Sequence, residues 1–150
     1  YETIGAAFEV YNTLGPGLLE SVYEKAMIVE LKSRGLSVQT QFPVEIHYKN
    51  TLIGSDLRLD LLVENKLIIE LKSVETLNSV HFKQVRTYMR LLDKSAGILI
   101  NFNVSDFRTG YKVINNNKNT CQYARYVEKK YEDSSYRCKR VCRKEPLRTT

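Results

Sequence analysis

The hydrophobic pattern of the chain changes its period at Gly35, and this change limits the folds that the sequence can adopt. Before Gly35, apolar residues recur with helical spacing, which predicts one helix over residues 3–14 and a second over residues 18–34. A Gly-Pro-Gly sequence at residues 15–17 separates the two helices. Gly35 itself is typical of the residue that follows a helix.

After this point the side chains alternate between apolar and polar over residues 38–48, which predicts a strand. Pro43 lies inside the run, so the strand is expected at the edge of a sheet or at a bulge. Two further strands, joined by a tight turn, are predicted over residues 52–63 and 66–74.

Helical spacing returns over residues 78–93. Residues 96–102 then form a short, nearly continuous apolar run, which is typical of a strand buried on both faces. A last strand is predicted over residues 111–114. The order α-α-β-β-β-α-β-(β) predicts an α/β fold with a mixed β-sheet flanked by helices.

The net charge of +6 is unevenly distributed along the 150 residues. Residues 118–150 hold ten Lys and Arg against four acidic residues, so residues 1–117 are neutral. We therefore predict a domain over residues 1–117 and a basic, Cys-containing tail over residues 118–150 that is partly helical. Such a tail either follows a phosphate backbone or is simply a solvated charged end, which is the commoner case.

All cysteines lie in this tail: Cys121, Cys138 and Cys142. An odd number of cysteines, without a secretory signal at the start of the sequence, predicts a reducing compartment and a cytoplasmic location. No apolar run reaches the ~20 residues that a membrane span needs, so no membrane association is expected.

Charged residues interrupt the second and third predicted strands. A three-residue connection at residues 64–66 would place Asp60 opposite Glu70, with Cβ atoms ~5 Å apart. Lys72 shares a face with Glu70, because strand side chains alternate with period two. Two such close carboxylates repel each other unless a cation holds them, and oxygen ligands suit Mg²⁺ or Mn²⁺.

A neighbouring ammonium could orient a water molecule or offset charge on a phosphate, so the group predicts phosphodiester hydrolysis. The simpler alternative is a surface salt bridge of Lys72 with Asp60 or Glu70. Two features favour a site: Glu70 lies in an apolar strand, and Gln84 and Tyr88 share a face of the following helix.

Six blocks of the sequence, in this order, resemble those of the GxxExxY protein family, which is similar to the PD-(D/E)XK nuclease superfamily with its restriction-endonuclease-like fold. The resemblance spans about residues 1–117. The blocks are Gly17-Leu18-Leu19-Glu20-Ser21-Val22-Tyr23, Gln41-Phe42-Pro43-Val44, Asp60-Leu61-Leu62-Val63, Ile69-Glu70-Leu71-Lys72, Gln84-Val85-Arg86-Thr87-Tyr88 and Gly97-Ile98-Leu99-Ile100-Asn101-Phe102.

The resemblance implies a role for each matched residue. The metal ligands would be the carboxylates of Glu20, Asp60 and Glu70 with the carbonyl of Leu71. Lys72 resembles the catalytic lysine of the family. Support of the site or contact with substrate is implied for Tyr23, Gln84 and Tyr88, and Gln84 completes the expected catalytic set of Glu20, Asp60, Glu70, Lys72 and Gln84.

Other residues of the same region receive simpler interpretations. Tyr23 is expected to pack against the core or to hydrogen-bond a site carboxylate. Glu24 and Glu30, on the second predicted helix, are expected at the surface. The cysteine spacing of the tail is similar to that of nucleases with an iron–sulfur cluster, but such clusters need four ligands and residues 1–117 hold no cysteine. An iron–sulfur cluster is therefore not expected.

The sequence thus predicts a Mg²⁺- or Mn²⁺-dependent nuclease, with DNA favoured over RNA as the nucleic-acid partner. The alternative is a catalytically inactive nuclease-like module that binds nucleic acid or a partner protein. A homodimer or a larger complex stays open, and so does the choice between endonuclease and exonuclease.

Overall fold

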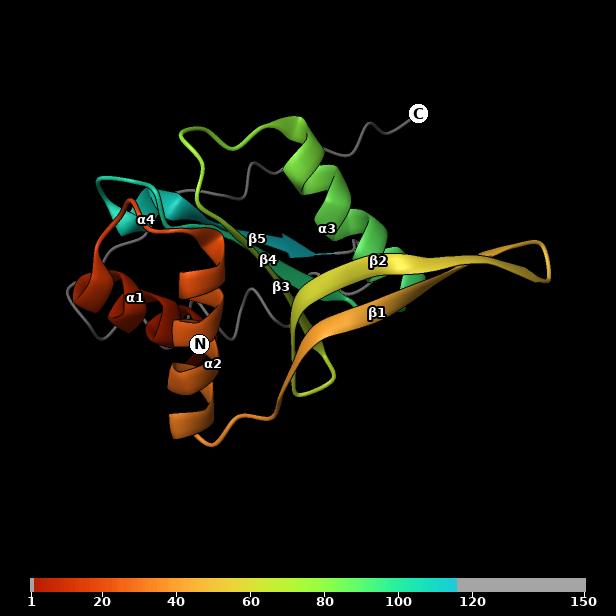
Figure 1. Cartoon of the computed structure of the whole chain (residues 1–150), viewed down its shortest axis with the longest axis horizontal. Helices are drawn as coiled ribbons and strands as arrows, with labels where there is room; N and C mark the ends of the chain where they lie inside the picture. Colours follow the sequence, from red (N-terminus) through yellow and green to blue (C-terminus); the bar gives the residue numbers. More distant parts are fainter. Residues whose placement is uncertain (1, 116–150) are drawn as a thin grey trace, which may run out of the picture. The chain divides into compact units, whose positions relative to one another are not determined.

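The computed structural model describes residues 2–115, and Figure 1 shows their arrangement. The predicted domain boundary, the partly helical tail and the three cysteines lie outside these residues. In chain order the elements are α1 (Glu2–Leu14), α2 (Glu20–Ser33), β1 (Val38–Tyr48), β2 (Thr51–Val63), β3 (Leu67–Lys72), α3 (Ser79–Leu91), β4 (Ala96–Asn101), α4 (Phe107–Gly110) and β5 (Tyr111–Asn115). This order confirms the prediction, which missed only the short α4.

The strands form one five-stranded sheet in the order β1-β2-β3-β4-β5. The crossover through α3 makes β3 and β4 parallel, whereas the other neighbours are antiparallel. The predicted α/β fold with a mixed sheet is therefore confirmed, and β1 lies at an edge, as Pro43 indicates. Within residues 2–115, no helix has both the length and the apolar character needed to cross a membrane.

Helices cover both faces of the sheet, and each face has its own hydrophobic core. The helices α1 and α2 pack on one face (Figure 1), in a cluster that includes Tyr23, Met27, Leu61, Ile69, Ile98 and Phe102. The helix α3 packs on the other, in a cluster that includes Val44, Leu59, Leu62, Ile68, Val85 and Met89. The strand β4 contributes to both clusters, as expected for a strand buried on both faces.

The alternation of β1 and β2 reverses at Gln41, which the sequence pattern does not predict. Gln41 has a φ of 47°, a left-handed backbone that is uncommon for a residue other than glycine. Before it, Val38 packs on the α1–α2 side, but Phe42 packs on the α3 side. In β2 the same reversal separates Leu61 from Leu59. The prediction of one continuous alternating strand over residues 38–48 is therefore right in its bounds and wrong in its single apolar face.

Beyond this point the β1–β2 hairpin leaves the sheet. Only Leu61, Leu62 and Val63 of β2 pair with β3, whereas β2 pairs with β1 back to Thr51. The rest of the hairpin projects as a two-stranded arm (Figure 1). The parting of β2 from β3 opens a gap in the pairing directly beside Asp60.

The helix α3 is held in place at its start and at its middle. At its start, Asn78 and His81 form a capping box, in which Asn78 N donates to His81 Nδ1 at 3.2 Å. At its middle, the helix lies against Gly97 of β4, where an added Cβ would come within 2.7 Å of Val85 Cγ1. A residue larger than glycine at position 97 would therefore displace the helix.

Candidate active site

The site lies where β2 separates from β3. The predicted register of β2 with β3 is confirmed at three residue pairs. The last of these pairs is Leu61 with Ile69, one position before Asp60 and Glu70. Instead of continuing the pairing, Asp60 turns its carboxylate to the backbone: Leu71 N donates to Asp60 Oδ2 at 2.8 Å. The strand pairing thus holds Asp60 beside Glu70, and the side chain of Asp60 satisfies a backbone donor of β3.

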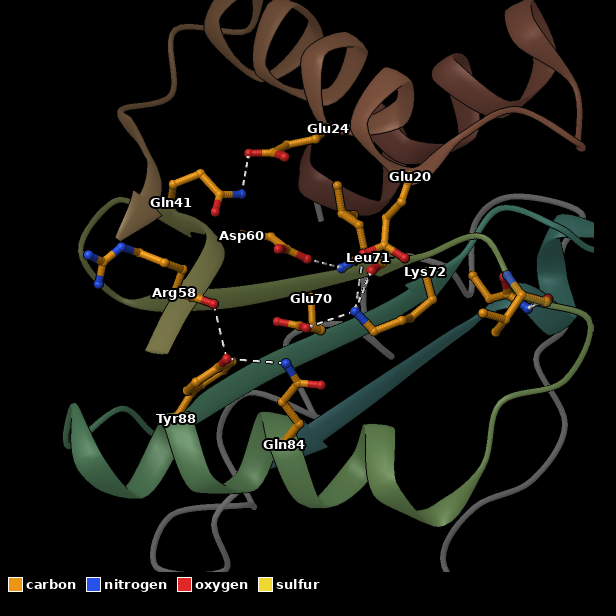
Figure 2. A network of polar contacts seen from close by, with 12 residues as sticks. Glu20, Glu24, Gln41, Arg58, Asp60, Glu70, Leu71, Lys72, Gln84 and Tyr88 are labelled. Atoms are coloured by element: carbon orange, nitrogen blue, oxygen red, sulfur yellow. Dashed lines mark hydrogen bonds and ion pairs between the residues drawn. The ribbon is translucent and has the colours of Figure 1, made fainter. Parts of the chain in front are cut away.

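Lys72 connects the end of β3 with the start of α2 (Figure 2). Its ammonium donates to Glu70 Oε1 at 2.8 Å, to Leu71 O at 2.8 Å and to Glu20 Oε1 at 3.3 Å. The Lys72 side chain is only 12% exposed, compared with 43% for Glu20. Since Glu20 lies 52 residues earlier in the chain, tertiary packing alone brings these groups together.

Glu70 is the most deeply buried of these carboxylates, with its side chain only 2% exposed. Its Oε1 accepts from Lys72, but its Oε2 is buried and has no hydrogen-bond partner among residues 2–115. Burial, and then the negative charge of Asp60, raise the pKa of Glu70 to about 7. A buried carboxylate oxygen without a partner is costly, so this position needs an explanation beyond packing.

The same environment changes the titration of the neighbouring groups. Burial raises the pKa of Asp60, although the N–H of Leu71 and the charge of Lys72 act against the change. Burial alone would lower the pKa of Lys72, but its hydrogen bond to Glu70 and the surrounding carboxylates outweigh burial and raise that pKa. The lysine therefore stays a cation at neutral pH, as an electrostatic role requires.

Helix α3 brings Gln84 and Tyr88 to the site from the opposite face of the sheet (Figure 2). Gln84 Nε2 donates to the Tyr88 hydroxyl at 3.1 Å, and that hydroxyl donates to Arg58 O at 3.0 Å. Burial raises the pKa of Tyr88, and the charges of Glu70 and Asp60 add to the effect. The predicted pair on one helix face is therefore present, with Tyr88 anchoring α3 to β2.

Tyr23 holds the loop that leads into α2. Its hydroxyl donates to Gly15 O at 2.6 Å and accepts from Leu18 N at 3.1 Å, while its ring stacks on Phe102 at 4.3 Å. Ser73 Oγ also donates to Leu18 O at 2.6 Å, which ties this loop to the end of β3. Of the two predicted roles of Tyr23, packing against the core is confirmed. Its hydroxyl bonds the loop backbone rather than a carboxylate.

These contacts explain the spacing of glycine, glutamate and tyrosine in this segment. Gly17 has a φ of 95°, which a residue with a side chain rarely adopts, so the loop turns there. The helix α2 then begins at Glu20, and Tyr23 reaches back one turn to fasten the loop. Glu20 is thereby placed at the first turn of α2, within reach of Lys72.

The sequence interpretation missed Glu24 and its partner Gln41. Gln41 Nε2 donates to Glu24 Oε1 at 2.8 Å, and the charge of Glu24 contributes to the raised pKa of Asp60. Glu24 is partly exposed, and its charge acts on Asp60, so a surface position describes it only in part. Glu30 is also partly exposed, and it pairs with Arg34 at the other end of α2. The four-residue spacing from Glu20 to Glu24 was the available signal.

The donor set fits a divalent cation by its chemistry. Carboxylates from α2, β2 and β3 act on Lys72, and Glu70 Oε2 is a buried oxygen without a partner among residues 2–115. Such hard oxygen donors fit Mg²⁺ or Mn²⁺. As they stand, however, residues 2–115 contain no group of three or more acidic, His or Cys side chains arranged to hold an ion. The cation that bridges Glu20 and Glu70 in this structure is the ammonium of Lys72.

Comparison with known proteins identifies the superfamily of the chain. A family model described as the PD-(D/E)XK nuclease superfamily matches residues 1–114. No curated protein and no solved structure matches the chain. The narrower GxxExxY family is not tested by this match and stays a prediction. The matched residues include every element from α1 to α4, with most of β5, so the chain belongs to the PD-(D/E)XK nuclease superfamily.

Proposed function

We propose that the protein is a nuclease that requires Mg²⁺ or Mn²⁺ and hydrolyses phosphodiester bonds in DNA. The observation that carries the proposal is the buried Glu70 carboxylate: one oxygen accepts from Lys72, and the other has no partner among the residues that the structure describes. A purely structural ion pair would gain by satisfying both oxygens. Membership of the superfamily supports nuclease activity in general.

Each residue of the site has a role in this proposal. Glu20, Asp60 and Glu70, with the carbonyl of Leu71, would hold the metal, which supplies an activated water and stabilises charge on the phosphate when bound. Lys72 orients that water or offsets the charge that develops on the phosphoryl oxygens. Tyr88 fixes Gln84, whose amide faces the substrate. Water adds to phosphorus and releases one proton to the solvent, the bond from phosphorus to the leaving oxygen breaks, and that oxygen takes up a proton from the solvent.

The remaining expectations about partners and location stay proposals of the same kind. We favour DNA over RNA as the nucleic-acid partner, and we place the protein in the cytoplasm on the argument from its odd number of cysteines. The dependence on Mg²⁺ or Mn²⁺ rests on the chemistry of the donor set.

The test combines Mn²⁺ titration calorimetry with cleavage of labelled DNA on the same protein samples. We expect the wild type to bind Mn²⁺ and to cleave DNA, and Asp60→Ala with Glu70→Ala to lose both. Lys72→Ala should retain Mn²⁺ binding but lose cleavage by roughly 100- to 1000-fold.

The outcomes separate the proposal from its rival. Cleavage that survives in Lys72→Ala would show that the mechanism is wrong. Wild-type protein that binds DNA in a salt-dependent manner, but binds no Mn²⁺ and cleaves nothing, would favour the inactive nucleic-acid-binding module.

A further inference from the structure

The outer face of α3 carries positive charge and no negative charge. The three residues Lys83, Arg86 and Arg90 are exposed, and the helix contains no Asp or Glu. Positions three and seven apart lie on one side of a helix, so the three cations form a single line along it. We refer to Lys83, Arg86 and Arg90 as the α3 basic stripe.

Within residues 2–115, no side chain of the stripe makes an ion pair or a hydrogen bond. The arginines elsewhere behave differently: Arg34 pairs with Glu2 and Glu30, and Arg108 pairs with Asp106. Among residues 2–115, the basic residues of α3 therefore have no acidic partner, although this part of the chain is otherwise rich in carboxylates.

Helix stability does not explain the stripe. A cation in the last turn interacts favourably with the helix dipole, which accounts for Arg90 alone. Lys83 and Arg86 lie earlier in α3 and have no acidic residue three or four positions away on the helix. Three cations on one line, without a partner in the described part of the chain, repel each other, so the arrangement costs stability unless an anion binds there.

The stripe lies on the same helix as Gln84, which reaches the candidate site. Lys83 precedes Gln84, whose amide bonds Tyr88 next to Glu70 and Asp60 (Figure 2). The seating of α3 against Gly97 and its capping box hold the stripe in a fixed position relative to the site. A strand of phosphates that leaves the site past Gln84 and continues over the outer face of α3 would meet the stripe.

We infer that the α3 basic stripe binds the phosphates of a nucleic-acid strand that flank the phosphate held at Glu70 and Lys72, an inference that rests on the proposed function. Seven residues of helix extend about 10 Å, which spans about three phosphates of one strand along a duplex axis. Lys and Arg on such a line contact phosphates without reading bases.

The test uses the whole chain and fluorescein-labelled duplex and single-stranded DNA, with binding followed by anisotropy in EDTA over a range of salt concentrations. We expect Lys83→Gln/Arg86→Gln/Arg90→Gln to weaken binding at least tenfold at low salt. The slope of log K against log salt should become shallower by roughly two to three for the duplex, since each phosphate contact contributes about 0.9.

A matched control removes the same kind of charge from the opposite face of the sheet. Lys25→Gln/Lys32→Gln removes two exposed lysines seven residues apart on α2, and Lys83→Gln/Arg90→Gln removes two exposed cations with the same spacing on α3. Only the second variant should lose affinity. Equal losses of DNA affinity in the two variants would mean that the stripe acts only through the net charge of the protein, and this result would overturn the inference. RNA of the same sequence, in a parallel titration, shows whether the stripe distinguishes the two nucleic acids.

Cleavage measured with Mn²⁺ on the same samples separates this inference from the proposed function. If the wild type cleaves DNA but the stripe variants bind like the α2 control, the inference fails and the function stands. If the wild type cleaves nothing with Mg²⁺ or Mn²⁺ but the stripe variants lose binding, the stripe stands and the hydrolytic function fails.

Discussion

The helices α2 and α3 pack on opposite faces of the sheet, yet both bring polar groups to the place where β2 separates from β3 (Figure 2). The helix α2 supplies carboxylates, Glu20 beside Lys72 and Glu24 beside Gln41. The helix α3 supplies no carboxylate; its contribution is the amide of Gln84 and the hydroxyl of Tyr88.

This difference divides the site by charge. Negative charge gathers on the α2 side, where it suits a cation, and positive charge lines the outer face of α3, where it suits a polyanion. In our proposal, the metal belongs to the first side and the nucleic-acid strand approaches along the second. A site with carboxylates on both sides would repel the phosphates that it has to bind.

The largest expected effect comes from changing one polar side chain on each helix and comparing the losses of Mn²⁺ binding and of cleavage. Glu20→Gln should weaken Mn²⁺ binding at least about tenfold and reduce cleavage by roughly 100-fold, because it removes a carboxylate ligand. Gln84→Ala should leave Mn²⁺ binding unchanged and reduce cleavage alone. Calorimetry and cleavage rates on the same samples test this. Equal losses of Mn²⁺ affinity in both variants would break the division between α2 and α3.

The next effect is a pH dependence of stability that arises from Glu70, which lies between α2 and α3. In the metal-free protein its pKa of about 7 exceeds the ordinary value of 4.5, so the folded state holds a proton that the unfolded chain has released. Stability should therefore fall as the pH rises from about 4.5 to about 7, by roughly 3 kcal/mol from this group.

Urea denaturation in EDTA at a series of pH values measures this dependence. Glu70→Gln, which cannot ionise, should flatten the fall of unfolding free energy in that window. Asp60→Asn should flatten it in part, since the charge of Asp60 is the second cause of the raised pKa. An unchanged slope in Glu70→Gln would show that another group titrates.

A smaller effect tests how α3 is seated. Gly97→Ala should destabilise the protein by about 1–3 kcal/mol, because the added methyl group would overlap Val85. The double variant Gly97→Ala/Val85→Ala, which removes the overlapping methyl groups, should lose less than the sum of the two single changes. Urea denaturation of the four proteins gives the coupling, and additive losses would contradict a close contact at this place.

The smallest effect concerns the backbone that turns Gln41 toward α2. Gln41→Ala and Gln41→Gly both remove the amide that bonds Glu24, but only glycine adopts a φ of 47° without strain. The glycine variant should therefore be more stable than the alanine variant by about 1 kcal/mol, the reverse of their usual order within a strand. The usual order, measured by denaturation, would mean that the left-handed turn is not strained.

Local patterns were sufficient for most of the fold. Helical spacing, strand patterns and the apolar run of β4 predicted every helix and strand except α4, because such patterns are properties of short segments. The length of the turn at residues 64–66 gave the register of β2 with β3 for the same reason. The short α4, a single turn capped by Asp106, has no periodic signal to detect.

The sequence by itself determined the order of the elements and the pairing that brings Asp60 close to Glu70 and Lys72. Only the tertiary structure decided the reversal of faces at Gln41, the hydrogen bond of Glu24 with Gln41 and the exposure of the α3 basic stripe. The reversal depends on the torsion of one residue, which alternation cannot reveal. The other two depend on which side of a helix packs against the sheet, and that is set by contacts between segments far apart in the chain.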